Sequence, residues 1–126
     1  MAKVAFVIKQ MALLLNDKNT AAKHSALAAK IKTGINTWLW LPEKGYYAQY
    51  LYGRNYKIVS PRSEALGEAL CIIWDIADKG RQKQIVAHAP VTDFGIPCIY
   101  PEIPGIPPYH NNAVWPLYKP IGCGRQ

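Results

Sequence analysis

Apolar residues recur at the three- and four-residue spacing of an amphipathic helix in two stretches near the start of the chain. The first stretch covers residues 3–15, and a polar break at 16–19 follows it. The second runs to about Trp38, and Asn19 or Thr20 can cap its first turn through a side-chain oxygen. Its apolar stripe consists of Leu27, Ile31, Ile35 and Trp38. The pattern predicts a pair of helices.

The pattern then changes to aromatic and β-branched residues around a Gly/Asn turn. Such runs at residues 45–52 and 56–59 flank a turn at 53–55, which is typical of a short β-hairpin. The hairpin separates the first helical pair from a second pair, so we expect consecutive αα-hairpins.

In the second pair, Ser63 can cap a helix from Glu64 to about Lys79, and Gly80 is a natural stop. We expect Glu68 to face solvent. The expected apolar stripe of this helix is Leu66, Leu70, Ile73 and Ala77. A short fourth helix is expected at about 81–88.

The last third of the chain has a different character. Eight prolines lie between Pro90 and Pro120 and exclude long helices there. The segment is also rich in isoleucine and aromatic residues, so we expect it to pack on a scaffold and to carry functional residues. The expected fold is all-α: antiparallel αα-hairpins with one short β-hairpin and a long Pro-rich C-terminal loop. It forms a single partial domain over 1–126, with helical hairpins at 1–90 and the loop at 91–126.

Composition excludes several classes of protein. The chain has 126 residues, of which 50% are hydrophobic and 18% are charged, so most of it should fold. No apolar stretch is long enough for a membrane helix, and the first fifteen residues do not have the pattern of a secretory signal. Neither a metal site nor a cofactor is expected, because the three cysteines and three histidines lack ligand spacing.

The net charge of +7 is unevenly placed. Residues 1–62 hold ten Lys/Arg and two Asp/Glu (+8), whereas residues 63–126 hold five and six (−1). A basic half can bind nucleic acid. Its lysines are scattered, however, and no nucleic-acid-binding motif accompanies them, so a solvated helix face is the favoured interpretation.

The segment Tyr109-His-Asn-Asn-Ala-Val-Trp-Pro116 resembles the Tyr-His-Asn-Gly-x-x-Trp-Pro element of six-hairpin glycosidases, which are (α/α)6 toroids and include glycogen-debranching-like enzymes. Two other segments fit the same pattern: Trp38-Leu-Trp40 followed by Gly45-Tyr-Tyr47, and Ser63-Glu-Ala-Leu-Gly67, where many members have Ser-Asp-x-Leu-Gly. The resemblance spans roughly residues 20–118. This chain departs from the pattern at Asn112 and Glu64.

The resemblance implies a carbohydrate substrate and an inverting hydrolase. A complete toroid has many more helices than the four expected here, so we expect this chain to be a piece of a longer enzyme. By itself it should be inactive or weakly active, and its exposed apolar faces should favour self-association. The compartment is left open, with the periplasm or the cell exterior as options for the parent enzyme.

Hydrolysis of a glycosidic bond normally needs two carboxyl groups. Glu102, in the proline loop a few residues before His110, is the first candidate, and Glu64 is the second. An ordinary loop carboxylate and a helix-start charge are the alternatives for these two residues. His110 and Asn111 can bind sugar hydroxyls or pin the loop.

Aromatic side chains supply the remaining expected contacts with substrate. The candidates are Tyr109, Trp115, Trp40 and Tyr47, with burial in the core as the alternative for the tryptophans. Two other functions stay open: a non-catalytic carbohydrate-binding or scaffold module, and a basic nucleic-acid-binding protein whose affinity would fall steeply with salt.

Overall fold

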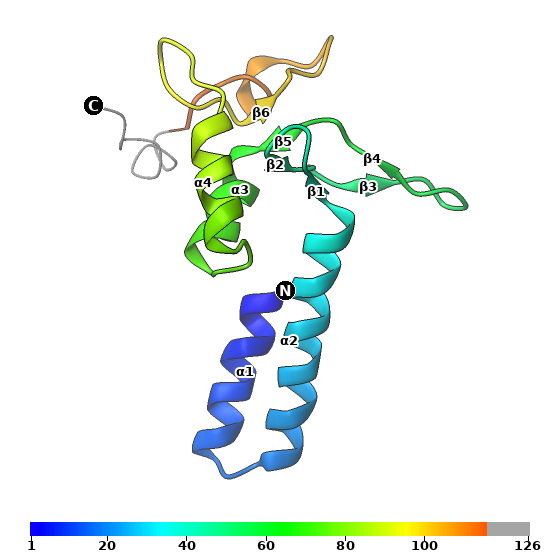
Figure 1. The fold of residues 1–126 in the computed structure, drawn as a ribbon, viewed down its shortest axis with the longest axis vertical. Coiled ribbons are helices and arrows are strands. Elements are labelled where there is room, and N and C mark those ends of the chain that lie inside the picture. The colour runs from blue at the N-terminus through cyan, green and yellow to red at the C-terminus, as the bar shows by residue number, and fades with distance from the viewer. Residues whose placement is uncertain (116–126) are drawn as a thin grey trace. The chain divides into compact units, whose positions relative to one another are not determined.

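The computed structural model of the protein describes residues 1–115. The chain divides into two compact units, Met1–Thr37 and a second that begins at Trp38. In the described part, four α-helices, six two-residue strands and one short 3₁₀-helix follow one another along the chain (Figure 1).

The first unit is built from helices α1 (Ala2–Leu14) and α2 (Lys18–Trp38), which run side by side in Figure 1. The fully buried residues of both helices are alanines: Ala5, Ala12 and Ala21. Both predicted helices are therefore present, but the predicted cap is wrong. Asp17 Oδ1 accepts a hydrogen bond from the backbone N–H of Thr20 at 3.0 Å.

Two small hairpins open the second unit. Strand β1 (Trp40–Leu41) pairs antiparallel with β2 (Tyr46–Tyr47), and β3 (Leu51–Tyr52) pairs antiparallel with β4 (Ile58–Val59). The second pair is the hairpin predicted from the sequence, and the first pair was not predicted. The β1–β2 turn requires Gly45, whose φ is +70° and whose Cβ, if it had one, would lie 2.6 Å from His88 Nδ1.

The second unit also contains helices α3 (Ala65–Ile73) and α4 (Lys79–His88). The third helix is shorter than predicted, because the backbone turns into the left-handed region at Asp75, with φ of +51°. The fourth helix starts slightly earlier than predicted. Asp78 caps it by accepting from the Arg81 N–H at 2.9 Å.

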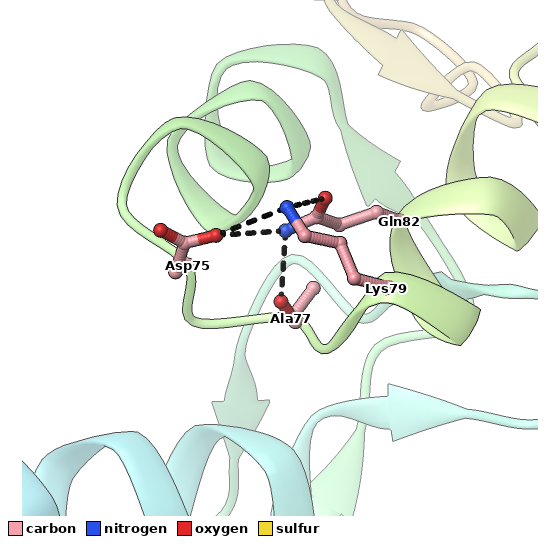
Figure 2. Close-up of polar contacts among 4 residues, drawn as sticks. All are labelled: Asp75, Ala77, Lys79 and Gln82. Atoms are coloured by element: carbon pink, nitrogen blue, oxygen red, sulfur yellow. Dashed lines mark hydrogen bonds and ion pairs between the residues drawn. The ribbon is translucent and has the colours of Figure 1, made fainter.

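A polar network joins the end of α3 to the start of α4 (Figure 2). Gln82 Nε2 donates to Asp75 Oδ1 at 3.2 Å and to the carbonyl of Ala77 at 3.0 Å. Lys79 Nζ donates to Gln82 Oε1 at 3.1 Å and lies 3.5 Å from Asp75 Oδ1. This network fixes the turn between α3 and α4, and both helices line one cavity.

The proline-rich segment returns to the start of α3. Strand β6 (Ile99–Tyr100) pairs antiparallel with β5 (Ser63–Glu64), with Ser63 opposite Tyr100. Farther along, Pro97 forms a single bridge with Val114, and a 3₁₀-helix, η1, covers Pro108–His110. Proline has no backbone N–H, so neighbouring residues donate the hydrogen bonds of this pairing; the Cys98 N–H, for example, donates to the Ala113 carbonyl.

The predicted cap of α3 is also wrong. Ser63 lies in β5 and is buried. The next residue, Glu64, occupies the N-cap position, and its Oε2 accepts from the Gly67 N–H at 3.1 Å.

The predicted all-α class, with αα-hairpins as a sector of a toroid, is contradicted. The described residues form a mixed α/β structure with three antiparallel strand pairs. The four predicted helices are present, but short segments between α2 and α3 form strands. The proline-containing segment after α4 supplies one more strand, β6. In the second unit the buried apolar residues come from strands, helices and loops: Tyr46, Tyr47, Ala48, Ala69, Ile76, Ala77, Ile85, Cys98 and Ile99.

Candidate functional site

Two of the segments that carry the sequence resemblance, at residues 63–67 and 109–115, are brought together around β6. On one side, the Ala65 N–H donates to the Cys98 carbonyl at 2.9 Å. On the other side, the Ile99 N–H donates to the Asn111 carbonyl at 2.7 Å, and the Cys98 N–H donates to the Ala113 carbonyl at 2.9 Å. The Tyr-His-Asn segment and the start of α3 are therefore held on opposite sides of the same short strand.

Asn111 holds the proline-rich loop in shape. Its side chain is almost completely buried, and its Oδ1 accepts from the Ile103 N–H at 2.7 Å. Its Nδ2 donates to the carbonyls of Ile103 at 2.9 Å and Ile106 at 3.1 Å. The sequence left two roles open for Asn111, binding sugar hydroxyls or pinning the loop. These three hydrogen bonds pin the loop.

Three rings gather next to this amide. The Tyr109 ring lies 4.5 Å from the His110 ring and 4.9 Å from the Trp115 ring, and the rings of His110 and Trp115 stack at 5.4 Å. The Trp115 indole N–H donates to the Tyr109 carbonyl at 2.8 Å, which fixes the indole. Because 64% of Tyr109 is exposed, the cluster offers an aromatic surface to solvent.

The two candidate catalytic carboxylates have different surroundings. Glu102 is exposed, and its Oε2 accepts from Asn112 Nδ2 at 2.6 Å. Glu64 is half-buried and engaged as the cap of α3. The strand register places Glu64 opposite Ile99, three residues before Glu102. Glu102 therefore belongs to the exposed aromatic loop, and Glu64 belongs to the helix start.

Trp40 and Tyr47 pack inside the second unit. Their rings meet edge-to-face at 4.9 Å, and the Arg81 guanidinium lies 5.1 Å from the centre of the Trp40 ring. Tyr47 is buried, and this burial raises the pKa of its phenol to about 12, because the charged phenolate is disfavoured away from water.

Glu68 was expected to face solvent, and this prediction is wrong. Only 9% of the residue is exposed, and its Oε1 accepts from the Tyr47 N–H at 2.7 Å. Its Oε2 is buried without a hydrogen-bond partner among the described residues. Burial raises the pKa of this carboxyl to about 8; the negative charge of Glu64 adds to the rise, and the Tyr47 N–H opposes it.

Glu68 lines a cavity of about 60 Å³ in the second unit. The walls come from β2, β5, α3, α4 and the loop after α4: Tyr46, Ser63, Ala65, Ala69, Ile72, Ile85, Val86, Ala89, Pro90, Val91, Ile96 and Pro97. Most of these side chains are apolar. A buried carboxyl group in an apolar cavity is more typical of a functional site than of the rest of a protein.

The face of α3 that is buried differs from the face that the sequence pattern predicts. Two members of its expected apolar stripe, Leu66 and Ile73, are 41% and 58% exposed, whereas Glu68 and Ala69 are buried. The helix is apolar on several sides, so periodicity alone leaves the buried face undetermined.

Within residues 1–115, no three His, Cys, Asp or Glu side chains gather closely enough to hold a metal ion. Among the helices of that part of the chain, none is both long and apolar enough to cross a membrane. No protein family, characterised protein or solved structure shows significant similarity to this chain.

Proposed function

We propose that residues 38–115 are a carbohydrate-binding part of a glycoside hydrolase catalytic domain. The observation that carries this proposal is the exposed aromatic cluster of Tyr109, His110 and Trp115, which hydrogen bonds to β6 tie to the start of α3. These are two of the three segments that provide the sequence resemblance to six-hairpin glycosidases. Their proximity supports a common role for residues that lie far apart in the sequence.

The chemistry of the cluster suits a sugar ring. A sugar presents an apolar C–H face, which packs on a flat aromatic ring, and hydroxyl groups at its edge, which need polar partners. Glu102 and Asn112, which are hydrogen-bonded to each other, can supply such partners from the same loop. An ionised carboxylate has about four lone-pair positions, so Glu102 keeps acceptor capacity after its bond to Asn112.

For hydrolysis, we assign Glu102 as the carboxyl group that faces the sugar and Glu64 as the second acidic group. Because Glu64 is engaged with the Gly67 N–H, we expect this chain to bind saccharide well but to hydrolyse it slowly. Glu102→Gln should abolish that hydrolysis. Binding without any hydrolysis would instead indicate a non-catalytic carbohydrate-binding module.

NMR titration with a panel of oligosaccharides tests the binding proposal. The indole N–H signal of Trp115 should shift, and Tyr109→Ala should weaken binding at least fivefold. Tyr56→Ala is the matched control, because Tyr56 is also exposed (85%) but lies in the β3–β4 turn. An indole signal that stays in place with every saccharide, or equal losses in both variants, would refute the proposal.

The proposal includes self-association through α1. Four apolar residues at helical spacing leave a stripe on this helix exposed: Val4, Val7, Met11 and Leu14. Exposed apolar stripes of this kind favour burial against another protein surface. A second copy of the chain provides the same stripe, so a symmetric helix pair is the expected contact.

A further inference from the structure

The Glu68 cavity lies outside the aromatic cluster and has no role in the proposed carbohydrate binding. We propose that it binds the end of a primary alkylammonium group, with the alkyl chain against the apolar walls and the ammonium group donating to the Glu68 carboxylate. The free amine end of a lysine side chain or of a small aliphatic amine has this chemistry.

The hydrogen bonds of Glu68 define which atom is left for a ligand. Oε1 is occupied by the Tyr47 N–H at 2.7 Å, which also holds the carboxyl group in place. Oε2 is the atom without a partner among the described residues. A buried carboxyl group with an unpartnered oxygen is costly, so a ligand that donates to this group gains more than one that donates to a hydrated carboxylate.

The apolar walls of the cavity favour a ligand whose remaining part is hydrocarbon. Ala65, Ala69, Ile72 and Ile85 line the cavity with hydrocarbon. A sugar would leave most of its hydroxyl groups without partners there, and an anion would be repelled. An ammonium group gains a charge-assisted hydrogen bond, and an alkyl chain gains burial.

The size of the cavity agrees with a short chain. One water molecule needs roughly 10–15 Å³ of such space. The cavity of about 60 Å³ therefore accommodates roughly four to six heavy atoms. Butylammonium, with four carbons and one nitrogen, matches this room.

The groups around Glu68 determine how binding depends on pH. Glu64 adds negative charge, the Cys71 thiol and the Tyr47 phenol interact electrostatically with Glu68, and Arg81 contacts Tyr47 from α4. Burial raises the pKa values of the Cys71 thiol and the Tyr47 phenol to about 12, so both stay neutral at pH 6–8. Tyr46 donates its hydroxyl to the Pro61 carbonyl. Of the three groups Glu68, Cys71 and Tyr47, the Glu68 carboxyl group is therefore the one that changes charge in this range.

The experiment compares n-butylammonium with 1-butanol, its neutral counterpart of the same shape. The amide N–H signal of Tyr47 is the reporter, because this group donates to Glu68. An alkylamine stays protonated up to pH ~10. Binding of butylammonium should therefore tighten on the order of tenfold per pH unit from pH 6 toward pH 8, as Glu68 ionises, whereas binding of 1-butanol should not tighten.

Glu68→Gln is the decisive variant, because its amide oxygen still accepts from Tyr47 and its amide nitrogen carries no charge. It should lose at least tenfold in affinity for butylammonium and retain affinity for 1-butanol. Glu43→Gln, which removes a negative charge at an exposed position, is the control and should change butylammonium binding less than threefold. The proposal is overturned if wild-type protein binds the two ligands equally at pH 8 or shows no pH dependence, and the wild-type profile decides this even if the Glu68→Gln substitution prevents folding.

Discussion

The backbone N–H of Tyr47 donates a 2.7 Å hydrogen bond to Oε1 of Glu68, which joins strand β2 to the first turn of α3. This bond holds a carboxyl group inside an apolar cavity, where its second oxygen has no partner among the described residues. We therefore expect ionisation of Glu68 to act on the packing of β2 against α3.

Stability should fall as pH rises from about 5 to 8. The pKa of Glu68 is raised from 4.5 to about 8 in the folded protein, so in this range the folded state holds a proton that the unfolded state has released. The stabilisation is fully present below pH 4.5 and is lost as pH approaches 8; each unit of pKa difference corresponds to about 1.4 kcal/mol. Urea denaturation at several pH values measures it.

Glu68→Gln is the control for this prediction. Glutamine keeps the acceptor for Tyr47 and does not titrate, so the decline in the free energy of unfolding between pH 5 and 8 should largely disappear. A variant that shows the same decline as the wild-type protein would mean that other groups cause it.

Asn111→Ala should destabilise the proline-rich loop, whereas Asn112→Ala should not. Alanine at 111 leaves the Ile103 N–H and the carbonyls of Ile103 and Ile106 without their partner, at a cost of about 2–4 kcal/mol in the free energy of unfolding. Asn112 is exposed and its side chain donates to the exposed Glu102 carboxylate, so its loss should cost less than about 1 kcal/mol. Thermal denaturation of the two variants compares adjacent asparagines directly, and equal losses would contradict the pinning role.

Glu64→Ala should destabilise α3 because it removes the acceptor for the Gly67 N–H. The expected cost is about 1 kcal/mol in the free energy of unfolding. Glu64→Gln retains an acceptor oxygen and should lose less. If both variants are as stable as the wild-type protein while hydrolysis of a saccharide is lost, Glu64 acts in chemistry and not as a cap.

Self-association should depend on the exposed stripe of α1. Replacing Met11 and Leu14, which are 57% and 84% exposed, with lysine should lower the average mass measured by analytical ultracentrifugation at high protein concentration. Gln10→Lys adds positive charge to the same helix outside the stripe and should have little effect. A wild-type protein that is monomeric at every concentration would show that the stripe does not mediate association.

Several elements follow from local sequence alone. The helical spacing in residues 3–15 and 20–38 corresponds to α1 and α2, and the Gly/Asn turn at 53–55 corresponds to the β3–β4 hairpin. These predictions succeed because helix periodicity and turn chemistry act over a few residues and need no distant partner. The functional interest in the segment Tyr109–Pro116 came from its resemblance to a family motif, and its function stays a prediction.

Other features depend on contacts between distant parts of the chain. The strand pair β5–β6 joins positions more than thirty residues apart, and it replaces the predicted all-α class with a mixed one. The burial of Glu68 likewise depends on β2, α4 and the loop at 89–97 meeting one face of α3. Nothing in the apolar periodicity of α3 distinguishes that face, because the helix is apolar on several sides. Local sequence thus determined where most helices and one hairpin form, and tertiary packing decided which side chains became buried, because burial depends on what the rest of the chain places against them.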